Sequence, residues 1–141
     1  MSGLRNYQAI AQGVGALLIA SCASLGGIGP DSSDDAKRAA VAARANSRAV
    51  ALITADLDRA YEHLSSGSKT LINKDNFRVR MSRWPFTAYR IEGIDCDRES
   101  CRVKSRLTFD HPAMRGKGVS APSTEVWVLE RGEYFFVFPA S

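Results

Sequence analysis

The chain has 141 residues, of which 45% are hydrophobic and 24% are charged, and its formal net charge is +4. This balance is typical of one globular domain and excludes a largely disordered chain. No apolar run reaches 18 residues and no long repeat is visible, which excludes an ordinary membrane-spanning helix, solenoids and propellers. The mild positive charge gives no reason to expect a nucleic-acid partner.

The first 21 residues have the layout of a secretory signal peptide. Arg5 is the only charge before an apolar segment over residues 9–20, which is too short to span a bilayer. The segment ends in Ile19-Ala20-Ser21-Cys22, which resembles the lipobox of bacterial lipoproteins. The alternatives are an uncleaved anchor and a cytosolic helix with a buried cysteine.

The lipobox resemblance implies that residues 1–21 are removed and that Cys22 receives a lipid such as palmitate, which joins the protein to a membrane. Ala23 then implies the inner leaflet of the outer membrane, facing the periplasm. Residues 22–33 are expected to be the lipidated cysteine and a flexible tether, because they are small, Gly-rich and interrupted by Pro30. Residues 34–141 are expected to form a single domain.

Two further cysteines, Cys96 and Cys101, are separated by four residues and flanked by strand-like sequence. A hairpin would place them opposite each other, near disulfide distance, and the periplasm is oxidising. We therefore expect a disulfide. A redox pair or half of a metal site are the alternatives, but the spacing is unlike a redox motif and no second cluster of ligands exists.

The first half of the domain has helical character. Ser33 is a candidate N-cap for a long helix that ends near Gly67, and Asn73 is a candidate cap for a short helix over residues 74–82. The buried stripe of the long helix is expected to be Val50, Ile53, Leu57, Ala60, Tyr61 and Leu64.

The second half alternates between apolar and polar residues, as half-buried strands do. Gly93 is a candidate bulge, and residues 111–122 are expected to form a loop. The last two strands are apolar on both sides, which predicts cover on both faces. Strands are expected over residues 86–95, 101–109, 124–131 and 133–138. The predicted class is α+β, with a long and a short helix against one face of a curved, cone-like antiparallel sheet of about four strands.

The order of these elements looks like the nuclear-transport-factor-2-like superfamily over roughly residues 46–139. The resemblance rests on residues 51–65, on Phe77 and on the final Tyr134-Phe-Phe-Val-Phe138. A cystatin-like fold is the alternative. Enzymes of the superfamily, such as ketosteroid isomerase-like proteins, place an acid and a tyrosine inside the cone, and the corresponding candidates are Asp56, Asp58, Tyr61, Tyr89 and Asp110.

None of these candidates is expected to be catalytic. Asp56 and Asp58 flank the buried Leu57 and so point to solvent, and Tyr61 lies on the buried stripe. His63 and His111 are far apart in sequence and are expected on the surface. Since no serine elbow, Walker loop or zinc-protease motif occurs, we expect no cofactor and no metal.

Alternation places Arg102, Lys104 and Arg106 on one side of a strand. They predict either a basic stripe that contacts an anionic partner, or a solvated face that discourages aggregation.

The expected function is therefore a membrane-anchored, non-enzymatic binding or assembly module of the envelope, whose partner is an envelope protein or an anionic polymer. The alternative is a protein that binds a small apolar ligand, or an isomerase-like enzyme. The interior decides between them. An acid buried beside Tyr61 or Tyr89 in an open pocket favours the enzyme, whereas an interior filled by Trp127 and Phe136 favours the binding module.

Overall fold

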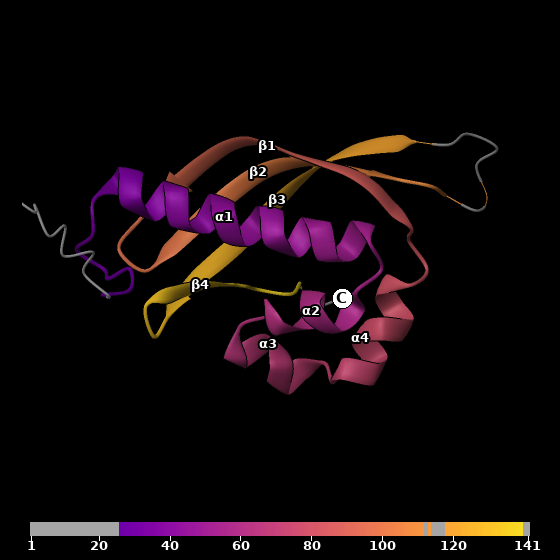
Figure 1. The fold of residues 1–141 in the computed structure, drawn as a ribbon, viewed down its shortest axis with the longest axis horizontal. Coiled ribbons are helices and arrows are strands. Elements are labelled where there is room, and N and C mark those ends of the chain that lie inside the picture. The colour runs from indigo at the N-terminus through magenta and orange to yellow at the C-terminus, as the bar shows by residue number, and fades with distance from the viewer. Residues whose placement is uncertain (1–25, 112, 114–117, 140–141) are drawn as a thin grey trace, which may run out of the picture.

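The computed structural model describes residues 26–111, 113 and 118–139 (Figure 1). Helices come first in the chain and strands follow. They are α1 (Asp34–Ile53), α2 (Leu57–Glu62), α3 (Ser66–Leu71), α4 (Lys74–Met81), β1 (Phe86–Cys96), β2 (Ser100–Phe109), β3 (Val119–Glu130) and β4 (Glu133–Phe136). The α+β class expected from the sequence is confirmed.

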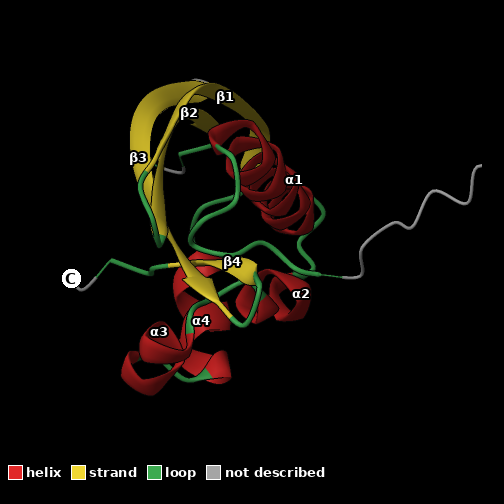
Figure 2. Ribbon diagram, turned by 90° about the vertical axis from the view of Figure 1, so that its left-hand side faces the viewer, coloured by secondary structure: helices red, strands yellow, loops and turns green. Residues whose placement is uncertain are grey.

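The four strands form one antiparallel sheet in the order β1-β2-β3-β4. Strands β1 to β3 arch over α1, while α2, α3 and α4 lie below β4 (Figure 2). The register of β1 against β2 shifts between Ile91 and Gly93, so the bulge expected at Gly93 is present. A bulge bends its strand and increases the twist, and here it lies where the sheet curves over the helix.

Helix α1 lies in the concavity of the sheet. The Ser33 side chain caps it by accepting a hydrogen bond from the Ala36 amide at 3.2 Å, as expected. Its buried face carries Val41, Ala45 and Leu52. The small alanines along this helix allow it to approach the strands closely, so Val41 is fully buried (0% exposed).

The long helix expected to reach Gly67 is broken in two places. Ala55 has a φ of 57°, and Asp56 caps α2 through the Arg59 amide at 3.1 Å. Ser65 then caps α3, so Gly67 lies inside a new helix rather than at a helix end. Asp and Ser side chains compete for backbone amides and favour caps over helix interiors, which is why a continuous apolar pattern does not give a continuous helix.

The breaks also change which residues are buried. Val50 is 54% exposed and Ile53 is 39% exposed, although both were expected in the buried stripe. Ala60, Tyr61 and Leu64 are buried as expected. The stripe therefore divides between α1 and α2, which change direction at Ala55.

Strand β3 begins at Val119, inside the segment expected to be a loop. Pro122 lies within it, paired with Arg106 of β2. β4 pairs with β3 only from Trp127 onward, so Pro122 lies where the other edge of β3 is unpaired and the missing amide is not needed. This strand was expected to be covered on both faces, but only one face is. Trp127 on the inner face is fully buried, whereas its neighbour Val126 on the outer face is 38% exposed.

Cys96 and Cys101 are joined by a disulfide, as predicted, at a Cα–Cα distance of 4.0 Å. They are register partners at the closed end of the β1–β2 hairpin. The bond therefore fixes the pairing of β1 with β2 at the turn, and Cys101 lies in the core at 1% exposure.

Residues 26–33, the later part of the expected tether, lie against the domain, and we refer to them as the N-terminal strap. The Ile28 amide donates to the Gly132 carbonyl at 3.0 Å. The Lys37 ammonium donates to the carbonyls of Pro30 at 2.6 Å and Asp97 at 2.9 Å. These bonds join the strap to the β3–β4 turn and the β1–β2 turn, so the strap belongs to the folded domain.

Gly27 provides a test of the strap. A Cβ at Gly27 would lie 2.8 Å from the Gly132 carbonyl oxygen, a backbone atom that cannot turn away, whereas a Cβ at Gly26 meets nothing within 4 Å. We expect Gly27→Ala to lower the free energy of unfolding by about 1 kcal/mol and to speed hydrogen exchange at the Ile28 amide. Urea unfolding and exchange by NMR measure both effects. Gly26→Ala is the matched control, and equal behaviour of the two variants would contradict the contact.

Candidate functional site

A group of polar side chains is buried between α1 and the inner face of the sheet. Glu125 of β3 is 3% exposed, Ser105 of β2 is 1% exposed and Arg48 of α1 is 6% exposed. The Glu125 carboxylate accepts hydrogen bonds from the Ser105 hydroxyl at 3.1 Å and from the Trp127 indole at 3.0 Å. A buried acid is tolerated when its oxygens are bonded and its charge is balanced, and these neighbours supply the bonds.

Arg48 supplies the positive charge. Its guanidinium carbon lies 3.8 Å from the centroid of the Phe136 ring, a cation–π contact in a desolvated place. Burial lowers the pKa of Arg48, while the nearby Glu125 carboxyl acts to raise it. Since an arginine stays protonated in proteins, Arg48 places a positive charge near the Glu125 carboxyl in the core.

Tyr89 of β1 completes this group. Its hydroxyl is buried and makes no well-formed hydrogen bond within the described part of the chain. Burial first, and then the Glu125 charge, raise the pKa of Tyr89, so the phenol stays protonated. An acid beside Tyr89 was the arrangement sought from the sequence, and the acid is Glu125, a residue that the sequence analysis missed. Its position two residues before Trp127 on an alternating strand was the available signal.

This buried group is closed rather than open. Trp127 is 0% exposed, and its ring packs against Phe136 with centroids 5.6 Å apart. Asp110, the acid named from the sequence, lies instead at the end of β2, where it accepts a hydrogen bond from the Gly118 amide at 3.0 Å. The interior beside Glu125 is therefore filled by Trp127 and Phe136.

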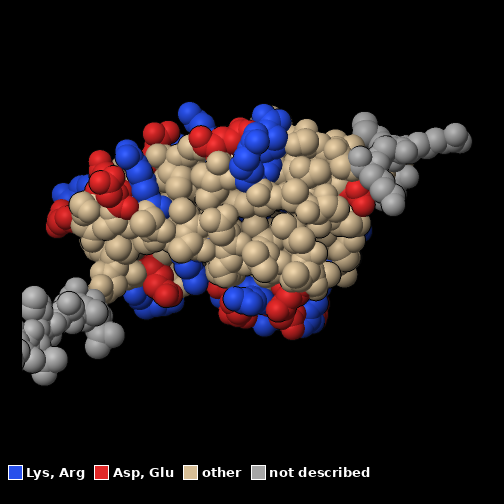
Figure 3. Space-filling model, turned by 45° about the horizontal axis from the view of Figure 1, so that its top comes forward, with Lys and Arg blue, Asp and Glu red and all other residues tan. Residues whose placement is uncertain are grey.

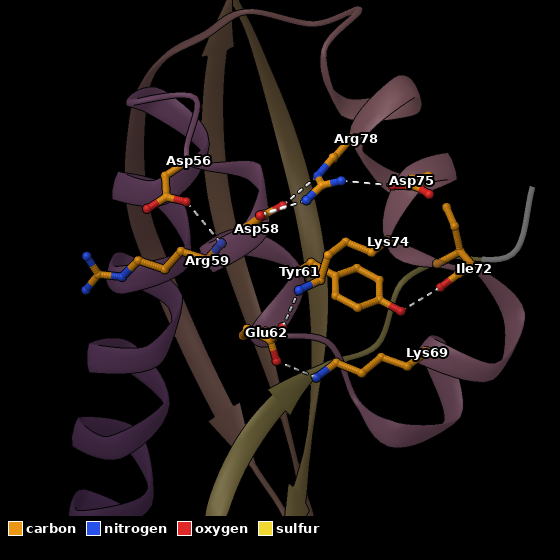
Figure 4. Close-up of polar contacts among 10 residues, drawn as sticks. All are labelled: Asp56, Asp58, Arg59, Tyr61, Glu62, Lys69, Ile72, Lys74, Asp75 and Arg78. Carbon is orange, nitrogen blue, oxygen red and sulfur yellow. Dashed lines mark hydrogen bonds and ion pairs between the residues drawn. The ribbon is translucent and has the colours of Figure 1, made fainter.

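The other sequence candidates form surface contacts around α2 and α4 (Figure 4). Asp58 binds Arg78 through both carboxylate oxygens, at 2.6 and 2.7 Å, and these hydrogen bonds lower the pKa of Asp58. The Tyr61 hydroxyl donates to the Ile72 carbonyl at 3.0 Å. Asp56 is a helix cap. Each residue has a structural partner, and no two of them form an acid–base pair.

His63 was expected on the surface, and this expectation was wrong, because the residue is 5% exposed. Its Nε2 lies 3.2 Å from the Ser47 hydroxyl. Burial lowers the pKa of His63 to about 4, and the charges of Arg44 and Arg48 act in the same direction. The imidazole is therefore neutral at pH 7, and α2 buries it against α1. His111 contacts Trp84, with ring centroids 5.0 Å apart.

The basic residues of β2 lie on the outer face of the sheet among acids. Arg106 is 2.8 Å from Glu92, which also binds Arg90 at 2.9 Å. Lys104 is 3.9 Å from Asp95, and Arg102 is exposed. Figure 3 shows acidic and basic side chains side by side on the face it presents rather than a continuous basic area. This pairing favours the solvated face over the basic stripe.

An apolar pocket of about 290 Å³ lies at the other end of the sheet. In Figure 1 this is the end where β1 begins and β2 ends. The Trp84 ring meets the Phe109 ring edge-on at 5.4 Å, and Phe86 meets Phe109 at 6.5 Å. The lining is Trp84, Phe86, Leu107, Phe109, Ala121, Pro122 and Ser123. We call this site the aromatic pocket.

The aromatic pocket adjoins the buried polar group along the inner face of the sheet. Ser123 of the lining pairs in register with Ser105, and Leu107 of the lining pairs with Tyr89. From the sequence, Phe109 was expected only as the last residue of a strand, and Trp84 lay between an expected helix and an expected strand with no role of its own. The pocket was missed because it exists only once the curved sheet brings these residues together.

Within residues 26–111, 113 and 118–139, no three metal-ligating side chains gather where they could hold an ion. No helix in that part of the chain has the length and apolarity needed to cross a membrane. The lipobox residues 19–22 lie outside the described residues.

No family model and no curated protein matches this chain. Solved structures do match it. A SEC-C motif containing protein from Rhodopseudomonas palustris, known from a solution structure, aligns with a TM-score of 0.54 and 20% identity over 63% of this chain and 68% of its own. The crystal structure of a sec-c motif containing protein from Psychrobacter arcticus aligns with a TM-score of 0.57 and 9% identity over 79% of this chain and 62% of its own. At these identities the likeness shows the fold alone.

The resemblance to the nuclear-transport-factor-2-like superfamily, with a cystatin-like fold as the alternative, is therefore corrected. The matching structures are SEC-C motif containing proteins, and none of the comparisons supports the resemblance to lipoproteins. The segment 51–65 that carried the superfamily resemblance is not one helix, because the chain turns at Ala55. Element order and an Ala-Tyr pair suit many α+β domains, so they do not identify a family.

The buried His63 predicts how stability depends on pH. Its pKa is about 4 in the folded protein against an ordinary 6.5, so the unfolded chain binds more protons between these values. The titration of His63 therefore makes the free energy of unfolding rise between about pH 4 and pH 6.5. Above pH 6.5 it adds no further change. We expect His63→Gln to remove a rise of up to about 3 kcal/mol. Urea unfolding at several pH values measures it, with His111→Gln as the control. A rise that persists in His63→Gln would contradict the assignment.

Proposed function

We propose that this protein is a non-enzymatic binding module of the bacterial envelope, and that the aromatic pocket receives an apolar group of its ligand. The pocket is the observation that carries the proposal. Trp84, at its mouth, is 39% exposed, and an aromatic ring held partly in water is a common feature of binding sites.

The buried polar group argues against the isomerase-like alternative. A catalytic carboxyl needs access to substrate, whereas Glu125 is 3% exposed and already accepts hydrogen bonds from Ser105 and Trp127. The Glu125 carboxyl is held by these structural contacts, and the Arg48 guanidinium lies near it, so this acid has a structural role. The outer face gives less support for an anionic polymer as partner, because Arg106 and Lys104 have acidic neighbours.

The disulfide supports the periplasm as the compartment of this protein. Structural disulfides persist in the periplasm and are rare in the cytosol, and the bond between Cys96 and Cys101 closes a hairpin at the surface. Attachment to the outer membrane through a lipid on Cys22, facing the periplasm, remains part of the proposal and rests on the sequence of residues 1–23.

Labelling with palmitate tests the attachment. We expect the wild-type chain to incorporate palmitate and to sediment with membranes, and Cys22→Ala to lose both properties, because the thiol of Cys22 is the acceptor. The double variant Cys96→Ala/Cys101→Ala keeps Cys22 and is the control for the loss of a cysteine. Equal labelling of wild type and Cys22→Ala would show that the lipid, if any, is elsewhere.

The neutral fluorescent probe N-phenyl-1-naphthylamine tests the aromatic pocket. We expect its fluorescence to rise on binding, and Trp84→Ala to raise the Kd about tenfold, equivalent to about 1.4 kcal/mol. Leu71→Ala is the matched control, because Leu71 is 75% exposed on α3 and outside the pocket. Ala121→Leu fills the pocket from its floor and should also weaken binding. Unchanged affinity in both pocket variants, with folding verified by circular dichroism, would contradict the proposed function.

A further inference from the structure

The chemistry of the aromatic pocket restricts what it can bind, and this inference rests on the proposed function. At about 290 Å³, the cavity is at the lower limit of small-molecule sites. The residues that line it carry no ionisable side chain.

The walls favour an aromatic ligand. Trp84 and Phe109 are perpendicular, with an interplanar angle of 90°, and Phe86 meets Phe109 at 68°. Aromatic rings prefer such edge-to-face neighbours. A flat ring inserted between Trp84 and Phe86 extends this arrangement, whereas a flexible aliphatic chain loses rotamer freedom without gaining ring contacts.

The charge of the surroundings favours a neutral ligand. A carboxylate placed in the pocket would leave water without finding a cation in the lining. It would also approach Glu125, which lies two residues along β3 from the lining residue Ser123 on the same face of the strand. Arg48, a buried cation of α1, is near Glu125 and is not among the lining residues.

The polar groups of the lining determine where the ligand carries its own polar atom. Among the lining residues, Ser123 carries a hydroxyl and Trp84 carries an indole N–H. Both groups can donate to an oxygen. We infer that the aromatic pocket binds a small neutral aromatic molecule that carries one hydroxyl or carbonyl oxygen, with Ser123 as the residue that recognises this oxygen.

Three ligands of matched size test the inference: 4-methylphenol, toluene and 4-methylbenzoate. NMR titration of the full chain, with the amides of β2 and β3 as reporters, measures each affinity. We expect 4-methylphenol to bind about fivefold more tightly than toluene, as one hydrogen bond provides, and 4-methylbenzoate not to bind. Ser123→Ala should reduce the affinity for 4-methylphenol to that for toluene and leave toluene unchanged. Ser120→Ala, an exposed serine on the same strand, is the matched control.

Several outcomes would overturn the inference. They are equal binding of 4-methylbenzoate and 4-methylphenol, equal binding of hexan-1-ol, or no effect of Ser123→Ala on 4-methylphenol. If N-phenyl-1-naphthylamine binds in a Trp84-dependent way while 4-methylphenol does not bind, the inference fails and the proposed function stands. If neither binds, both fail.

Discussion

The Glu125 carboxylate is the constraint on which the arrangement of the core depends. A carboxyl group at 3% exposure needs hydrogen-bond partners for its oxygens and a favourable electrostatic setting, or the folded state loses several kcal/mol. Ser105 provides a hydrogen bond from the neighbouring strand β2, and Trp127 provides one from two residues further along β3. Arg48 of α1 lies close enough for the Glu125 carboxyl to act on its pKa, so the buried polar group includes α1 as well as the sheet.

The position of α1 in turn decides which parts of the inner face are open. Where α1 packs against the sheet and β4 pairs with β3, Trp127 and Phe136 fill the interior. The aromatic pocket instead takes its lining from the connection between α4 and β1 and from the three long strands, with no residue of α1. A closed polar core and an open apolar pocket are thus two parts of one concave surface, covered by the helix at one end and not at the other.

Features encoded by short stretches of sequence were predicted well. The caps at Ser33 and Asn73, the bulge near Gly93 and the disulfide hairpin each depend on residues a few positions apart. The break at Ala55 was not predicted, because the apolar pattern continues through it while the capping side chain of Asp56 stops the helix.

The candidate site was harder to predict, because its parts come from distant segments. Alternation with Trp127 places Glu125 on the inner face, but its compensating charge lies on α1, and nothing in the sequence links the two. The aromatic pocket depends on how strongly the sheet curves. The periodicity of apolar residues carries no information about the curvature of a sheet. The lining residues could therefore be assigned to strands and a loop, but not to one site.

The contact between the N-terminal strap and the β3–β4 turn has a kinetic consequence. Each strand pairs with its neighbour in sequence, so the sheet can form through short loops, whereas the contact of Gly27 with Gly132 closes nearly the whole described chain. Closing a loop of this length costs chain entropy before the contacts at its ends can stabilise it. These contacts therefore form late in folding. We therefore expect the strap to detach as a local opening that leaves the sheet intact, and a variant that weakens it to change the rate of unfolding rather than the rate of folding. Stopped-flow measurements with Gly27→Ala separate the two rates.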